Sequence, residues 1–452
     1  MSRTRLTGKI VVPGSPSYRK DRQNLNLSIQ KYPCIIVFCQ NRCDVKNALK
    51  WAREQRTPFR VRSGRHSYEN FSLVNRGLII DVSEMKGIVY HPEQQMAYIQ
   101  AGAELGMVYQ QLWDNRVTIP AGTSYNVGLS GLALGGGIGM LTRAYGLTCD
   151  SIEEIEIVVP CEKHGAKIIC ASQTKNCDLF WACCGGGGGN FGIVTAFKFK
   201  VYPVANVSIF SITWNWEDFH ASYNSWQNLA PFTDSRLTSQ IELFASGTTT
   251  ASGEFLGSPK ELEELIKPLL ETGTPLNVMI QSIPYIEAVS FFNSPAGNLP
   301  APFKRSGSFV YEPLPDKAIE TMKQFLENAP NRQTTIWQQA LGGAVTEYAP
   351  KETAFFHRKA MIAQEYNTSW TCKDQKHENI CWVEGIRNAL KPYTKGDYVN
   401  WPDHAIKNWP CAYYGSNYKM LRKVKTEYDP YNVFCFSQSI RPYPPNGHYW
   451  PL

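Results

Sequence analysis

The sequence has no apolar run that approaches the roughly 20 residues of a membrane-spanning helix. Its nearest candidate, residues 127–141, is short and rich in glycine. The first residues, MSRTRLTGKIVVPG, lack the apolar core of a secretory signal peptide. We therefore expect a cytoplasmic protein that does not associate with a membrane.

The sequence also lacks the patterns of several ligand-binding classes. Its 13 cysteines include no CxxC pair, so we expect no metal site and, in a reducing compartment, free thiols. The net charge is +7, but Lys and Arg are scattered, whereas nucleic acid binding needs a concentrated basic footprint. No GxxxxGK[ST] phosphate loop occurs. The glycines of residues 185–192 also do not stand in the order that defines the dinucleotide fingerprint, which is a strand, then GxGxxG, then an acidic residue. We expect no nucleic acid partner.

The length of 452 residues favours two or three domains. An α+β unit begins near residue 30, where Asp44 is a candidate N-cap for a helix and short apolar runs predict strands at residues 34–39, 59–62, 78–82 and 96–101. From about residue 205 the pattern changes to strands rich in Ile, Phe and Thr that alternate with helices, such as the one expected over residues 315–328. A last helix is expected around residues 416–428.

Three glycine-rich segments lie within the first 195 residues and are separated by predicted strands. The first is RVRSGRHSYE (residues 60–69), the second spans residues 121–146, and the third contains five consecutive glycines, residues 185–189. Glycine lets a backbone approach a ligand closely and direct N–H groups at an anion. A large flat cofactor with a pyrophosphate would need such donors along much of its length.

These segments, with their flanks, resemble the vanillyl-alcohol-oxidase/PCMH-type flavoproteins, in particular their berberine-bridge-enzyme-like branch. The matching pieces are RVRSGRHSYENFSLVNRGLIIDVSEMKGI, AGTSYNVGLSGLALGGGIGMLTRAYGLTCDSI, DLFWACCGGGGGNFGIVT, TAFFHR and YVNWPD…AYYGSNYKMLRKVKTEYDPYNVFCFSQSI. The resemblance covers nearly the whole chain in family order. It implies a PCMH-type FAD-binding domain (residues 30–205), a substrate domain with an antiparallel sheet backed by helices (206–395), and a C-terminal segment returning to the FAD domain (396–452).

The resemblance implies that His66 bonds covalently to the 8α-methyl of FAD. It also implies a set of cofactor-binding residues: Arg62, Ser63, Gly64, Arg65, Ser67, Gly122, Thr123, Ser124, Val127, Gly128, Ser130, Gly131, Gly139, Gly189, Asn190, Gly192, Val194 and Asn400. Two departures from the family pattern matter. Arg65 stands where a second glycine is usual, so its side chain must avoid or contact the pyrophosphate. Ser124 stands where several relatives carry a cysteine that forms a second link, so we expect attachment through His66 alone.

The resemblance also suggests the catalytic residues. A small β-branched residue at Val127 is associated in the family with dioxygen access, which favours an oxidase. The motif Tyr398-Val399-Asn400-Trp401 ends in tryptophan where relatives have a tyrosine base, and an indole N–H cannot accept a proton. Glu347 is therefore a candidate base, with Tyr398 and Tyr413/Tyr414 in reserve.

We expect an oxidase that transfers a hydride from an alcohol, sugar or secondary-metabolite C–H to FAD and reduces dioxygen to hydrogen peroxide. Two alternatives remain open from the sequence. One is a dehydrogenase that uses an acceptor other than dioxygen. The other is a flavin-bearing structural or coat-associated protein with little turnover, which the missing tyrosine motivates. The expected partners are a small-molecule substrate and dioxygen.

Overall fold

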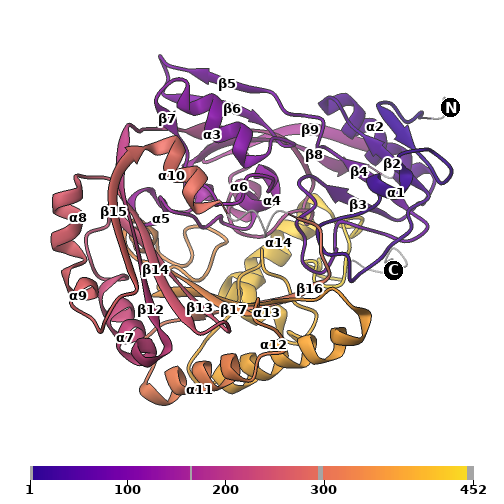
Figure 1. Cartoon of the computed structure of the whole chain (residues 1–452). Helices are drawn as coiled ribbons and strands as arrows, with labels where there is room; N and C mark the ends of the chain where they lie inside the picture. Colours follow the sequence, from indigo (N-terminus) through magenta and orange to yellow (C-terminus); the bar gives the residue numbers. More distant parts are fainter. Residues whose placement is uncertain (1–3, 163–164, 294–298, 445–452) are drawn as a thin grey trace.

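The computed structural model describes residues 4–162, 165–293 and 299–444 (Figure 1). Two sheets form the first part of the chain, and one large sheet forms the second. The expected α+β class, with an antiparallel sheet backed by helices, is confirmed.

The first sheet carries the residues that lead into the histidine loop. Its strand order is β1 (Lys9–Val11), β2 (Ile35–Phe38), β4 (Leu78–Asp81) and β3 (Phe59–Arg62). Strands β2, β4 and β3 are parallel, while β1 pairs with β2 in the antiparallel sense. Because β1 belongs to this sheet, the folded unit begins earlier than the expected boundary at residue 30.

Helix α2 (Arg42–Glu54) connects β2 to β3 and buries Val45, Ala48, Leu49 and Ala52, which share one helical face. The expected N-cap at Asp44 was wrong. Asn41 caps the helix, because its side chain accepts from the main-chain N–H groups of Cys43 and Asp44. Asp44 instead accepts from the Gln40 N–H and the Thr7 hydroxyl, so it fixes the segment before the helix.

The second sheet is antiparallel throughout, in the order β5 (Ile88–His91), β6 (Met96–Gln100), β10 (Ile193–Lys200), β8 (Ile152–Cys161) and β9 (Gly165–Ser172). A small ribbon joins β7 (Val117–Thr118) to β11 (Tyr202–Pro203). The helices of this part are α1 (Tyr18–Asp21), α3 (Leu105–Trp113), α4 (Leu129–Leu134), α5 (Thr142–Tyr145) and α6 (Cys177–Cys183).

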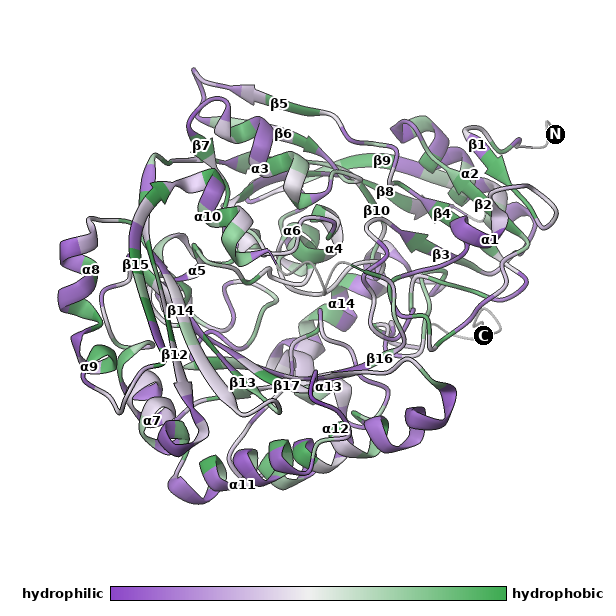
Figure 2. Ribbon diagram, viewed as in Figure 1, coloured by the Kyte–Doolittle hydropathy of each residue, from purple (hydrophilic) through white to green (hydrophobic). Residues whose placement is uncertain are grey.

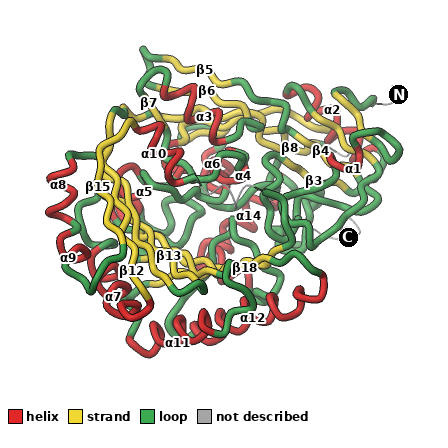
Figure 3. Tube along the Cα trace, in the orientation of Figure 1, coloured by secondary structure: helices red, strands yellow, loops and turns green. Residues whose placement is uncertain are grey.

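The third sheet has seven antiparallel strands and forms a curved layer (Figure 3). Its order is β15 (Asn277–Pro284), β12 (Asn206–Asn215), β14 (Thr248–Phe255), β13 (Leu237–Phe244), β17 (Thr335–Ala340), β18 (Ile362–Ser369) and β16 (Phe303–Val310). Its helices are α7 (Phe219–Leu229), α8 (Pro259–Leu265), α9 (Lys267–Leu270), α10 (Tyr285–Phe292), α11 (Asp316–Glu327) and α12 (Lys376–Leu390). Figure 1 shows α7, α8, α9, α11 and α12 on the outer side of this sheet.

Alternation along these strands assigns each face of the large sheet to a different core. In β12, Ile209 packs with the first two sheets, while its neighbour Phe210 packs with the outer helices. Helix α11 supplies Ile319 and Met322 to the outer core and is amphipathic along its length (Figure 2). Successive side chains of a strand point to opposite faces, so one face of the sheet is turned toward the first domain.

The C-terminal segment returns to the first domain, where α14 (Tyr418–Tyr428) contacts α6 and β8 and α13 (Trp409–Tyr414) lies beside it. Within this segment, the buried Lys425 ammonium pairs with Asp429 and donates to the carbonyl oxygens of Asn190 and Phe434. The last helix therefore holds the third glycine segment in place.

Candidate active site

A cavity of about 460 Å³ lies between the first domain, the large sheet and the C-terminal segment. All the cofactor-binding residues expected from the sequence line it, with the exception of Gly139. Val127, Tyr398 and Trp401 line it as well. The three glycine segments, which are far apart in the sequence, thus contribute to one site.

The histidine loop begins where strand β3 ends. The last residue of the strand, Arg62, is fully buried, and its Nε donates to Asp81 Oδ2 of the neighbouring strand at 2.6 Å. The next residue, Ser63, donates through its hydroxyl to the Ala101 carbonyl. These contacts hold the loop at the edge of the cavity.

The second glycine segment meets this loop through main-chain contact. A Cβ added at Gly64 would lie 2.0 Å from the Gly128 nitrogen, and one added at Gly128 would lie 2.5 Å from the Gly64 nitrogen. Real Cβ atoms never approach so closely, so both positions require glycine. The two loops form one wall of the cavity because neither carries a side chain at the contact.

Arg65 has a positive φ of 66°, which explains why glycine is favourable at this position. Its side chain extends toward Asp81, with Nη2 3.9 Å from Oδ2, and toward the ring of Phe38. The Asp81 carboxylate therefore interacts with two guanidinium groups, that of Arg62 and that of Arg65.

The His66 imidazole lines the cavity and is partly buried. Burial lowers the pKa of His66 to about 4, a hydrogen bond with Asn126 opposes this effect, and the charge of Arg305 adds to it. The ring is therefore neutral at pH 7, so one of its nitrogens carries an unshared electron pair.

Gly139, expected as a cofactor contact, does not line the cavity. A Cβ there would lie 1.8 Å from the Ala121 carbonyl oxygen. Its N–H donates to the Thr142 hydroxyl, and its carbonyl accepts from Gln339. Gly139 therefore allows close packing behind the cavity wall.

The glycine run at residues 185–189 has two roles. Gly185 packs against Phe355, where an added Cβ would lie 2.3 Å from the backbone nitrogen. Gly188 and Gly189 line the cavity, and a Cβ at either would meet no atom closer than 3.7 Å. The Asn190 side chain ends the run, since it donates to the carbonyls of residues 186 and 187 and accepts from the N–H of residue 440.

The Tyr398–Trp401 motif forms another wall. The buried Tyr398 hydroxyl accepts from the Gly137 N–H and from the Asn400 side chain, both at 2.8 Å. Burial raises the pKa of Tyr398, so its hydroxyl is a poor proton acceptor at neutral pH. The Trp401 ring lies edge-to-face with Tyr398 and rests on Gly307 of β16, where a Cβ would lie 2.6 Å from the indole.

Glu347 is not in the cavity, so the structure does not support it as a base. It ends a short 3-10 turn (Gly343–Glu347), is exposed, and is not among the cavity-lining residues. The reserve candidates Tyr413 and Tyr414 do line the cavity, but both are buried, and burial raises the pKa of each hydroxyl.

Two carboxylates that the sequence analysis missed face the cavity from the large sheet. Glu242 of β13 pairs in register with Trp337 of β17, and Trp337 pairs with Glu365 of β18. Their signal in the sequence is an acid inside a strand-like run: QIELF (residues 240–244) alternates polar and apolar residues, and IAQEYN (362–367) places Glu365 and Asn367 on the same face. The pairing of strands far apart in the sequence brings them together.

Glu365 is held beside the histidine loop. The Tyr68 hydroxyl, two residues beyond His66, donates to Glu365 Oε1 at 2.6 Å, and an Arg305 nitrogen lies 3.4 Å from the same hydroxyl. Burial raises the pKa of the Glu365 carboxyl, while Arg305 and the Tyr68 hydrogen bond oppose this rise. Burial likewise raises the pKa of Glu242 to about 7.

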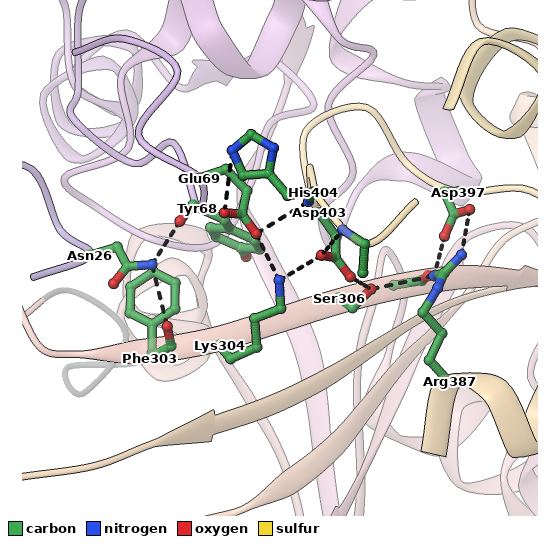
Figure 4. A network of polar contacts seen from close by, with 12 residues as sticks. Asn26, Tyr68, Glu69, Phe303, Lys304, Ser306, Arg387, Asp397, Asp403 and His404 are labelled. Atoms are coloured by element: carbon green, nitrogen blue, oxygen red, sulfur yellow. Dashed lines mark hydrogen bonds and ion pairs between the residues drawn. The ribbon is translucent and has the colours of Figure 1, made fainter. Parts of the chain in front are cut away.

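An ionic network fixes the histidine loop to the sheet and to the C-terminal segment (Figure 4). The Lys304 ammonium of β16 lies between Glu69 of the loop, at 2.7 Å, and Asp403, at 2.5 Å. Asp403 also accepts from the Ser306 hydroxyl. Because Glu69 follows His66 by three residues, this network holds the loop against the large sheet at the edge of the cavity.

The loop is suited to bind an anion. No main-chain N–H of residues 64–67 donates a hydrogen bond to any other part of the chain that the structure describes. Successive free N–H groups form a concave anion site, and Gly131, Gly188 and Gly189 leave room beside it. These residues fit the diphosphate of FAD, which the loop and the glycine segments would hold.

No group of three or more His, Cys, Asp or Glu side chains that could hold a metal ion occurs among the described residues. All 13 cysteines are free thiols. Over the same residues, every helix is too short or too polar to cross a membrane.

The fold places a cavity, lined by the glycine segments, between the first two sheets and the large sheet, as a protein that holds an extended, diphosphate-bearing cofactor requires. The FAD binding domain family matches residues 33–163, and the family described as berberine and berberine like matches residues 397–441. The chain is 58% identical to the uncharacterized FAD-linked oxidoreductase YgaK of Bacillus subtilis, over 98% of each chain.

More distant relatives agree. The chain is 28% identical to a chitooligosaccharide oxidase of Gibberella zeae, covering 95% of this chain and 91% of the relative. The structure of BBE-like 1 from Physcomitrella patens superposes with a TM-score of 0.90 at 28% identity, covering 96% of this chain and 97% of the other. The chain belongs to the berberine-bridge-enzyme-like FAD-linked oxidoreductases, as its sequence motifs predicted, and it is therefore an enzyme.

Proposed function

We propose that this enzyme is an oxidase that removes a hydride from the hydroxyl-bearing carbon of an alcohol or sugar. Glu365 takes the hydroxyl proton in this reaction. One observation carries the proposal: a buried carboxylate faces the cavity and is hydrogen-bonded to Tyr68, two residues from His66. A chitooligosaccharide oxidase among the relatives is consistent with a carbohydrate substrate.

The cofactor and the side chains of the cavity have separate roles in the proposed reaction. FAD supplies the two-electron acceptor for the hydride and, in an oxidase, passes the electrons to dioxygen to give hydrogen peroxide. Glu365 accepts the proton in this proposal, and burial raises the pKa of its carboxyl, which makes the ionised form a better base. Tyr68 and Arg305 orient its carboxylate, while Trp337 and Trp401 shield the site from water.

We further propose that FAD is attached covalently through His66 and has no second link at Ser124. The neutral imidazole supports this, since only an unprotonated nitrogen can form the bond. Ser124 lines the cavity, but a hydroxyl cannot form a thioether. We also propose that the chain consists of an FAD-binding domain (residues 30–205, extended at its start by β1), a substrate domain (206–395) and a C-terminal segment (396–452) that returns to the FAD-binding domain.

The dioxygen step rests on Val127, which lines the cavity at the loop that contacts Gly64. A small side chain at this wall leaves access for dioxygen, which favours an oxidase over a dehydrogenase.

Anaerobic mixing with alcohols and sugars, followed by admission of air, tests the proposed function. We expect a substrate to bleach the yellow colour, and air to restore it with one hydrogen peroxide released per turnover. Bleaching without recovery in air would identify a dehydrogenase. Absence of bleaching with every substrate would favour the structural alternative.

A further inference from the structure

The cavity carries opposite charges at its two ends. At one end Arg60, Arg62 and Arg65 line the cavity, with Asp81 as the carboxylate paired to the latter two, so this end has an excess of positive charge that suits the cofactor diphosphate. The large sheet lines the other end with two carboxylates and one guanidinium: Glu242, Glu365 and Arg305. With both carboxylates ionised, the sheet end has one excess negative charge.

Arg305 is already engaged on the Glu365 side of this end. Its Nε donates to Asn367 at 2.9 Å, and its guanidinium lies over the rings of Tyr68 and Phe303. Tyr68 in turn donates to Glu365. The cation and one carboxylate thus belong to one connected group around the Tyr68 hydroxyl.

Glu242 stands outside this group. Its carboxylate forms no direct ion pair with a cationic side chain in the described part of the chain, although the charge of Arg305 acts on it, and it lines the cavity from the centre of the sheet. Desolvated carboxylates without a cationic partner are costly, so such a group in a cavity favours a cationic ligand.

The walls beside Glu242 are aromatic. Trp337 lies next to it in register, and its indole N–H donates to Gln240 at 3.1 Å, which fixes the ring. Trp401 meets Trp337 edge-to-face at 5.8 Å. Indole faces attract ammonium groups and the C–H faces of sugars, so both carboxylate and rings suit a substrate amine.

We propose that Glu242 selects hydroxyl-bearing substrates that also carry a protonated amine, such as amino sugars, by pairing with the ammonium group. This inference rests on the proposed function, because it concerns the substrate of the same cavity. In this arrangement Glu365 receives the hydroxyl proton and Glu242 anchors the amine.

The titration of Glu242 gives the proposal a second signature. Burial raises the pKa of Glu242 to about 7; the Thr335 hydroxyl and the charge of Arg305 oppose this rise, and the charge of Glu365 adds to it. An ammonium group favours the ionised carboxylate. Because about half of the Glu242 carboxyls are protonated near pH 7, binding of an ammonium group releases a fraction of a proton from the protein, whereas a neutral analogue releases none.

Calorimetry on the flavin-loaded enzyme tests the proposal without turnover. Under anaerobic conditions at pH 7, with the flavin reduced beforehand so that no probe is oxidised and both carboxylates are kept, the probes are glucosamine and its neutral counterpart N-acetylglucosamine. We expect glucosamine to bind about tenfold more tightly, with proton release detected by comparing buffers of different ionisation enthalpy. Equal affinities, or binding without proton release, would overturn the proposal.

A second comparison assigns the effect to one residue. The change Glu242→Gln should remove the preference for glucosamine, while the matched change Glu347→Gln, on the exposed turn outside the cavity, should keep it. Unchanged flavin absorbance and melting temperature would show that the variants are folded. A preference that survives Glu242→Gln would overturn the assignment. Absence of turnover with every substrate would sink the proposed function but leave this binding preference measurable.

Discussion

Glu254 offers a quantitative test of the structure away from the proposed chemistry. It lies on β14, is 1% exposed, and faces a cavity of about 20 Å³ beside Tyr109 and Tyr285. Its Oε1 has no hydrogen-bond partner in the described part of the chain. Burial raises the pKa of this carboxyl from 4.5 to about 8.

This pKa makes the stability depend on pH in a defined direction. Below about pH 4.5 the carboxyl is protonated in both states, so it has no effect. Between pH 4.5 and 8 the unfolded chain releases the proton while the folded chain keeps it, so stability falls as pH rises. The full difference corresponds to about 5 kcal/mol above pH 8.

Replacing Glu254 with Gln removes the titration and keeps the shape. We expect the free energy of unfolding of Glu254→Gln to exceed that of the wild type by a few kcal/mol at pH 8.5, and the gap to close at pH 4.5. Urea unfolding followed by tryptophan fluorescence at both pH values measures this gap. The exposed Glu347→Gln should show the same small gap at both. If the difference in the free energy of unfolding between Glu254→Gln and the wild type were the same at both pH values, the argument from burial would be refuted.

Three further predictions concern the candidate site. His66→Ala should yield protein whose colour is lost on acid precipitation, whereas the wild type should stay yellow if the flavin is covalent. Glu365→Gln should lower kcat/KM about 10²- to 10⁴-fold, as expected for loss of a general base, while the flavin spectrum is retained; a near-normal rate would exclude this role. Gly64→Ala should reduce the flavin content of the purified protein, because the new Cβ would collide with the Gly128 nitrogen at 2.0 Å; full flavin loading would contradict the observed approach of the two loops.

The local sequence was informative wherever local contacts decide the structure. The strand expected at residues 59–62 is β3, and the helix expected at 315–328 is α11, because their apolar spacing matches the face that each buries. The histidine loop was recognisable because its special residues are consecutive. The helix N-cap was misplaced by three residues, since Asn41 and Asp44 are both capping residue types and only the backbone geometry separates them.

The glycines illustrate where local reasoning failed. Gly131 and Gly189 line the cavity, while Gly139 and Gly185 pack against Ala121 and Phe355. All four lie in segments of the same composition, so only the neighbours contributed by the fold distinguish a ligand contact from close packing.

The sequence by itself determined the family, the histidine loop and the glycine segments that meet there, because consecutive residues carry these signals. Only the tertiary structure decided which acids face the cavity. Glu242, Glu365 and Arg305 come from three strands whose register places them on one face, whereas Glu347 is turned into solvent. A strand exposes its side chains to opposite sides in alternation, so the fate of each acid depends on which surface packs against each face.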